Sequence, residues 1–188
     1  MPSIIRTAIV AAAATLAAPA FAQGYFGVSA GATNANIDCA GTLTCDNNDN
    51  GGKVFGGYRF PFGLGVEGMA YTYGEAKATL PYLASFATSS VKGRGFGAGV
   101  SYLVPFSPAW SATFRLGLAS NRTTATATIP GLSGTVEESN PAAYSGLQFS
   151  FHPSRNLSID VGADFTRFEL DGDKYSARML GVGLTFSF

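Results

Sequence analysis

Short segments in which apolar residues alternate with small or polar ones make up most of this chain. The segment that ends the sequence, GVGLTFSF, places Val182, Leu184, Phe186 and Phe188 on one side of a strand and glycine, threonine and serine on the other. Similar patterns predict strands at about residues 24–33, 52–61, 64–73, 94–104, 110–120, 142–151, 156–168 and 176–188. Each is close to the roughly 9–11 residues that a tilted strand needs to cross a bilayer.

The connections between these segments differ in length on the two sides of the predicted sheet. Tight turns rich in proline, glycine and serine lie at 60–63, 105–108 and 152–155. Longer, mostly polar connections lie at about 34–51, 74–93, 121–141 and 169–175, and we expect external loops there. Short turns on one side and long loops on the other are typical of an outer-membrane barrel.

The composition of the two strand faces indicates which face meets water. In 94–104, 110–120 and 156–168 the non-apolar face holds glycine, serine and isolated charges, which suit a narrow lumen better than an outer surface in water. The fold class we predict is therefore all-β, an eight-stranded antiparallel up-and-down transmembrane β-barrel with its apolar face toward lipid. A soluble periplasmic barrel that binds a lipophile is the alternative, with the apolar face inside.

Aromatic residues gather near both ends of the predicted strands and indicate two belts at the membrane interfaces. The upper belt would include Tyr73, Phe96, Tyr144 and Tyr175. Tyr71 and Tyr73 share their side of the strand with Glu67, however, so either a bulge shifts the register or a tyrosine points inward.

The N-terminal residues read as an export signal. One positive charge at Arg6 precedes an apolar stretch, and Ala20-Phe21-Ala22 fits the small-x-small cleavage rule. We expect a cleaved signal peptide over 1–22 and a barrel domain over 23–188. Export makes one disulfide between Cys39 and Cys45 the expected state of the two cysteines, as a local staple or as a rigid surface epitope.

Charge and candidate chemistry narrow the function further. Charged residues are 13% of the chain and the net charge is zero, which gives no reason to expect a nucleic-acid partner. The single histidine, His152, lies in a turn without a recognisable acid partner, so we predict that the protein is not an enzyme. Asp46 and Asp49 lack the ladder of a calcium loop, and we predict neither a cofactor nor a metal site.

Charged residues at inward positions predict a network inside the barrel. A charge in a narrow lumen must pair or lose its hydration at high cost, and both signs are present. Solvation at the barrel ends is the alternative for the same residues. The predicted set is Lys53, Arg59, Glu67, Arg115, Gln148, Asp160 and Asp164.

GYFGVSAG, GGKVFGGYRF, LGVEGMAYTYG, FRLGLA and the final LTFSF resemble the small eight-stranded outer-membrane β-barrel proteins related to the OmpA transmembrane domain. The resemblance implies insertion by the barrel-assembly machinery with Phe186 and Phe188 in the assembly signal, and an inward Glu67 and Arg115 that pair. It also implies a structural or surface-interaction role in the Gram-negative outer membrane.

The expected partners are therefore outer-membrane lipid, lipopolysaccharide and a host or surface ligand held by the external loops, as in an adhesin. We expect a monomer with a largely plugged lumen. An open lumen would instead make a narrow pore or a channel for small apolar solutes.

Overall fold

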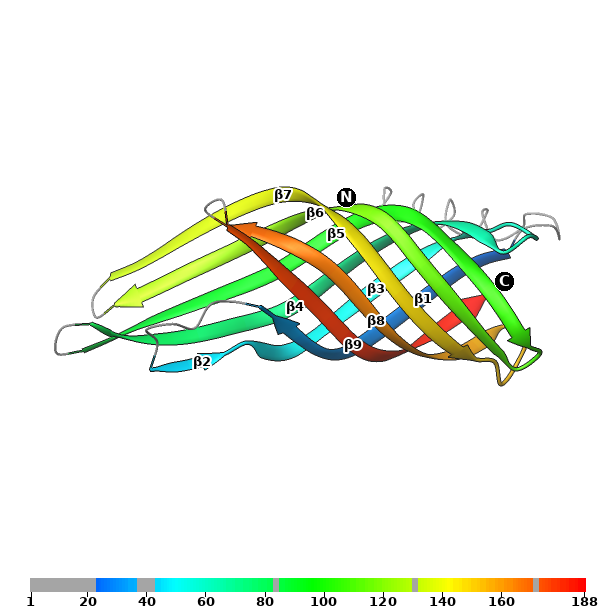
Figure 1. Ribbon diagram of the computed structural model, residues 1–188, viewed down its shortest axis with the longest axis horizontal. Helices are drawn as coiled ribbons and strands as arrows, with labels where there is room; N and C mark the ends of the chain where they lie inside the picture. The colour runs from blue at the N-terminus through cyan, green and yellow to red at the C-terminus, as the bar shows by residue number, and fades with distance from the viewer. Residues whose placement is uncertain (1–22, 37–42, 83–84, 130–131, 171–172) are drawn as a thin grey trace, which may run out of the picture.

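The computed structural model describes residues 23–36, 43–82, 85–129, 132–170 and 173–188, all in or beside β-strands (Figure 1). Among these residues no helix is long and apolar enough to span a membrane. The strands are β1 (Gln23–Ala35), β2 (Thr44–Asp46), β3 (Asn48–Arg59), β4 (Leu64–Tyr82), β5 (Ser85–Ser107), β6 (Trp110–Ile129), β7 (Leu132–Phe151), β8 (Leu157–Leu170) and β9 (Asp173–Ser187).

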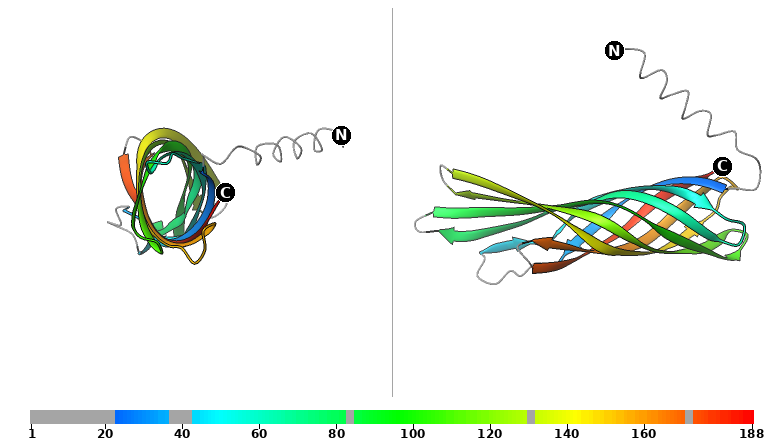
Figure 2. Two further views of the ribbon diagram at one scale, coloured as in Figure 1. Left: turned by 90° about the vertical axis from the view of Figure 1, so that its right-hand side faces the viewer. Right: turned by 90° about the horizontal axis from the view of Figure 1, so that it is seen from above.

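Eight of the described strands form a closed antiparallel ring, with β2 added to the upper part of β4. Neighbours in the chain are neighbours in the ring, and β1 closes it by pairing with β9 from Tyr25↔Ser187 to Ala35↔Ala177. Figure 2 shows the ring along its axis and the tilt of the strands across it. This confirms the predicted eight-stranded up-and-down barrel.

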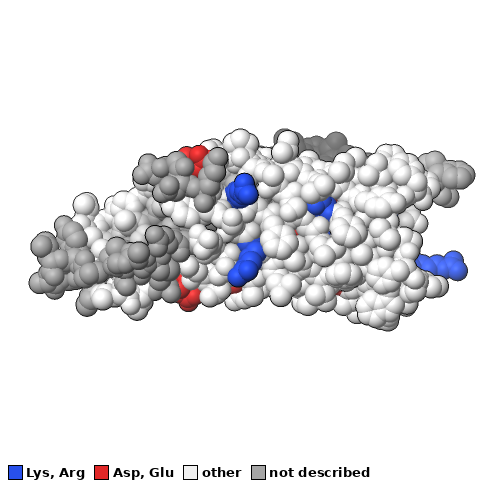
Figure 3. All heavy atoms as spheres, in the orientation of Figure 1, with Lys and Arg blue, Asp and Glu red and all other residues white. Residues whose placement is uncertain are grey.

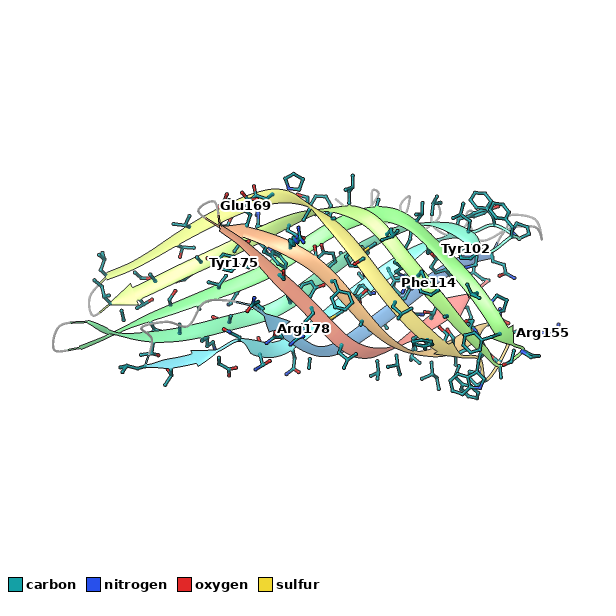
Figure 4. All side chains as sticks on the ribbon, viewed as in Figure 1. Tyr102, Phe114, Arg155, Glu169, Tyr175 and Arg178 are labelled. Carbon is teal, nitrogen blue, oxygen red and sulfur yellow. The ribbon has the colours of Figure 1, made fainter. Side chains whose placement is uncertain are left out.

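The two faces of the strands separate as the alternation predicts. Many outward side chains are large and apolar, as Tyr102 and Phe114 in Figure 4 illustrate. Figure 3 shows a mostly uncharged surface on the half of this face that lies toward the tight turns. Near the tight turns, exposed aromatic residues form the predicted lower belt. They are Phe60, Tyr102, Trp110, Phe149, Phe151, Phe186 and Phe188.

All four predicted external loops were wrong in their extent, because strands continue into each of them. Residues 74–82 and 85–93 continue β4 and β5, and most of 121–141 continues β6 and β7, so these connections are β-hairpins with short tips. The hairpins project past the ring at the end opposite the termini of the barrel (Figure 2), which we call the external end. Alternation of threonine with alanine in TTATATI suits a two-stranded ribbon, because β-branched side chains favour extended backbone.

A bulge in β4 resolves the question that Tyr71 and Tyr73 raised. The register with β5 shifts between Thr72 and Glu75, and Gly74 has a φ of 75°. Both tyrosines lie on the inner side of the bulge and are buried. Tyr73 and Tyr144 therefore do not belong to the upper aromatic belt, because they fill the lumen, whereas Phe96 faces outward as predicted.

The ladder between β7 and β8 stops before either strand ends. It runs from Phe151↔Ile159 to Tyr144↔Thr166, although both strands continue toward the external end. Beyond this point β8 stays paired with β9 and β7 with β6, and the two hairpins diverge in Figure 1. We call this place the β7–β8 seam.

Candidate functional site

The candidate functional site is the lumen, where charged and aromatic side chains from six strands meet. Glu67 on β4 and Arg115 on β6 form the lower ion pair, with Arg115 Nε 2.9 Å and 3.1 Å from the two carboxylate oxygens of Glu67. The hydroxyl of Tyr25 on β1 donates a further hydrogen bond of 2.9 Å to Glu67. Both charged side chains are at most 2% exposed, so their charges are satisfied by each other and not by water.

The upper ion pair lies toward the external end and joins strands on opposite sides of the ring. Lys53 Nζ on β3 is 2.7 Å from both carboxylate oxygens of Asp164 on β8. Lys53 also donates to the hydroxyl of Tyr144 at 3.1 Å, and that hydroxyl donates to Asp164. The pair therefore crosses the lumen as a closed hydrogen-bonded triangle.

One phenylalanine separates the two cations. The ring of Phe55 lies 5.0 Å from Lys53 Nζ and 4.6 Å from the guanidinium carbon of Arg115, both measured to its centroid. Contact with the ring face stabilises each cation, and the ring keeps the like charges apart. Gly27 faces this ring, and a Cβ there would come within 2.3 Å of Phe55, so only glycine leaves room for it.

An aromatic layer covers the upper ion pair on its external side. Tyr71 stacks on Tyr144 with 5.7 Å between centroids, and Tyr73 meets Phe168 edge-on at 5.5 Å. Tyr71 donates a 2.6 Å hydrogen bond to Asn121, whose amide donates to Thr166. The layer closes the lumen with side chains from β4, β6, β7 and β8.

The lower end of the lumen is polar and less fully paired. Thr185 donates to one oxygen of Asp160 at 2.6 Å, and the guanidinium of Arg59 lies 4.5 Å from the centroid of the Tyr25 ring. The other oxygen of Asp160 and Nε of Arg59 have no hydrogen-bond partner among the described atoms.

The cavity left between the two ion pairs is very small. It measures about 10 Å³ and is lined by residues that include Lys53, Phe55, Arg115 and Asp164. A volume of this size holds about one water molecule. The cavity therefore leaves little room for water between the two ion pairs.

The structure brings four of the six charges proposed for the lumen into two ion pairs, and places Arg59 and Asp160 apart from them. Sequence reasoning missed the partners Tyr25, Phe55 and Tyr144. The available signal was the alternation along each strand, which places these aromatic residues on the same inward side as the neighbouring charges.

The remaining predicted residues lie away from the lumen network. Phe186 and Phe188 are 52% and 53% exposed and face outward. Cys39 lies outside the described residues, so the disulfide with Cys45 remains a prediction.

His152 has a contact that the sequence did not suggest. Its Nε2 lies 2.9 Å from the hydroxyl of Ser111. Among the described side chains no carboxylate forms a hydrogen bond with the imidazole, so this pair lacks the third member of a hydrolase triad.

Comparison with solved structures finds the same fold in several small barrels. Ail, the attachment invasion locus protein of Yersinia pestis, in complex with the heparin analogue sucrose octasulfate, has a TM-score of 0.55 at 23% identity, over 87% of this chain and 99% of Ail. Neisserial surface protein A has a TM-score of 0.60 at 14% identity, over 88% of this chain and 97% of that chain. OprG of Pseudomonas aeruginosa has a TM-score of 0.54 at 15% identity, over 89% of this chain and 94% of that chain.

No curated protein sequence matches the chain significantly. The family described as outer membrane protein beta-barrel domain, however, matches residues 8–188. That range contains all eight strands of the ring, the outward apolar band and the filled lumen. The chain belongs to the outer membrane protein β-barrel domain family, and the outer membrane of Gram-negative bacteria is its location.

Proposed function

We propose that this protein is a closed, non-conducting barrel that anchors its external hairpins at the cell surface. The observation that carries the proposal is the pair of buried ion pairs, Glu67–Arg115 and Lys53–Asp164, which lie in the lumen at two levels. Their charges balance, so the lumen attracts neither cations nor anions strongly.

An ion that crossed this lumen would have to break at least one of these pairs. The broken pair would leave two charges buried in a space too small to hydrate them, at a cost of several kcal/mol for each charge. The aromatic layer of Tyr71, Tyr73, Tyr144 and Phe168 adds a second barrier, because its rings pack against one another across the space above the upper ion pair. A closed lumen favours an anchoring or surface-interaction role over transport.

The external hairpins supply a surface that a ligand can reach. The β4–β5 and β6–β7 ribbons extend beyond the ring, and threonine and serine pair across the second ribbon at Thr126–Thr135 and Thr128–Ser133. The similar barrel Ail is an attachment invasion locus protein. Attachment of a host or surface ligand through these ribbons is therefore the interaction we propose to test first.

The outward aromatic residues of the last strand suggest how the barrel is inserted into the membrane. We propose that the monomer is inserted by the barrel-assembly machinery, which would recognise the outward aromatics Phe186 and Phe188 on the last strand. Both side chains are available for such recognition, because they point away from the lumen.

Planar-bilayer recording tests the closed lumen directly. We expect no steady conductance from the refolded protein, while a general porin in the same bilayers conducts. A heat-dependent shift on gels must first show that the sample is folded. A large, stable, ion-selective conductance would contradict the proposal and support a narrow pore instead.

A further inference from the structure

A groove lies on the outer face of the barrel at the β7–β8 seam. It measures about 750 Å³ and extends over outward residues of β6, β7, β8, β9 and β1. Tyr144 and Thr166, the last pair of the β7–β8 ladder, are buried and contribute to its floor. Leu116 and Phe165 form apolar walls, and Arg167 and Arg178 add positive charge.

The two arginines are held close to each other. In the β8–β9 ladder Phe165 faces Arg178 and Arg167 faces Ser176, so the arginines are diagonal neighbours on the outer face, about 7–8 Å apart at their Cα atoms. Two side-chain amides fix β8 where the ladder has ended: Asn121 donates to the carbonyl of Arg167 at 2.5 Å and Asn140 to that of Glu169 at 3.4 Å.

These arginines differ from four other basic residues that the structure describes at the external end. Lys77 and Lys92 lie near Glu75, and Arg94 and Arg122 near Glu137, at 3.6 to 3.7 Å. Arg167 and Arg178 form no ion pair with any acidic side chain that the structure describes, and both are exposed. Basic side chains stand out in the middle of this face in Figure 3.

Their height places them at the upper edge of the lipid. On β9 the outward residues Phe186, Leu184, Val182 and Leu180 are followed by Arg178. Eight residues of strand span about 27 Å, or about 20 Å along the membrane normal at a tilt of about 40°. Figure 4 shows Tyr175 nearer the external end than Arg178.

We propose that the groove binds a phosphate-bearing lipid of the outer leaflet, of the lipid A kind. The phosphate would accept hydrogen bonds from Arg167 and Arg178, and an acyl chain would lie against Leu116 and Phe165. This proposal depends on the outer-membrane location and not on a closed lumen. It would therefore stand even if the barrel conducted ions.

Charge complementarity and height together identify this occupant. A guanidinium fork matches a phosphate in shape and charge, and long side chains at this depth extend to the headgroup level. A soluble polyanion would need no apolar wall. The groove has an apolar wall beside its two arginines, which suits a lipid with a phosphate headgroup.

Native mass spectrometry of the detergent-solubilised protein provides the test, with bisphosphorylated lipid A as the probe. We expect saturable one-to-one binding that weakens about thirtyfold in Arg167→Gln/Arg178→Gln, at about 1 kcal/mol for each arginine. The matched control is Arg94→Gln/Arg122→Gln, which removes the same charge at the external end from residues that pair with Glu137. The control should keep the affinity, and both variants should keep the heat-dependent gel shift.

Three outcomes would overturn the proposal. Equal weakening in both variants would show diffuse attraction and no defined site. Equal binding of dephosphorylated lipid A would show that the phosphate contact contributes nothing. Equally tight binding of inorganic phosphate or of a sulfated sugar would identify a site for soluble anions instead of lipid.

Discussion

Arg115 and Glu67 show what a buried charge requires of its surroundings. The two charges pair with each other. Glu67 also accepts from the hydroxyl of Tyr25 on β1, and Arg115 lies on the ring of Phe55 on β3. Removal of one member leaves the other charge buried without a counter-ion, and this costs more than the pair itself contributes.

We therefore expect Arg115→Ala to lower the free energy of unfolding by about 3–5 kcal/mol. Urea titration of the protein in lipid vesicles, followed by the tryptophan fluorescence of Trp110, measures this loss. The double variant Arg115→Leu/Glu67→Leu should recover most of it, because neither charge then remains. A loss below about 1 kcal/mol in the single variant would mean that water reaches Glu67.

Parity could predict that these charges point inward, but not which of them meet. Glu67 and Arg115 lie on strands separated by β5, and Lys53 and Asp164 lie on β3 and β8. Partner choice depends on the stagger between strands around the whole ring. No local segment of the sequence contains that information.

At the scale of elements, the bulge at Gly74 connects β4 to the neighbouring strand β3. The backbone N–H of Glu75 donates a 2.7 Å hydrogen bond to Asp49. Hydrogen bonds from the backbone of Asn50 and Glu75 lower the pKa of Asp49, which lies at the external mouth. A lowered pKa means that the contact is intact at neutral pH and is lost as the pH falls through that value.

Gly74→Ala should lower the free energy of unfolding by about 1–2 kcal/mol, because its φ of 75° is unfavourable for a residue with a Cβ. The new Cβ would also lie 2.7 Å from the carbonyl oxygen of Asn50. Hydrogen exchange at the amide of Glu75 should speed up. Gly134→Ala is the matched control, since nothing lies within 4 Å of a Cβ there. Equal effects at the two sites would refute a special role for the bulge.

Strand positions were predictable within the membrane but not beyond it. Alternation between lipid-facing and lumen-facing residues is strong where the two environments differ most. In 74–93 and 124–141 no described residue is buried on either face, so the pattern weakens although the backbone ladder continues. Polar composition then indicates a loop where a ribbon forms.

At the scale of the whole molecule, the ring and the external hairpins are held together by different interactions. The buried contacts described above lie within the ring, whereas the upper part of the β6–β7 ribbon is held mainly by its own ladder and by exposed side-chain pairs. Surface pairs of this kind contribute about 0–1 kcal/mol each.

Replacement of residues 124–137 by Asn-Gly should therefore leave the barrel folded. Thr123 and Glu138 already face each other in the ladder, and Asn-Gly suits the two-residue turn that would join them. The gel shift and the absence of conductance should persist, while attachment of cells to matrix proteins should fall if this ribbon binds the ligand. Loss of the folded band would show that the ring depends on the ribbon.

The pairing of β1 with β9 means that the barrel can close only late in folding. β1 can pair with β3 early, but its second edge stays open until almost all of the described chain has been delivered, because its partner is the last strand. Joining segments so distant in the sequence restricts the chain most at the final step. An open strand edge meanwhile invites pairing with the wrong chain. We therefore expect the open edge of β1 to need shielding until β9 is in place.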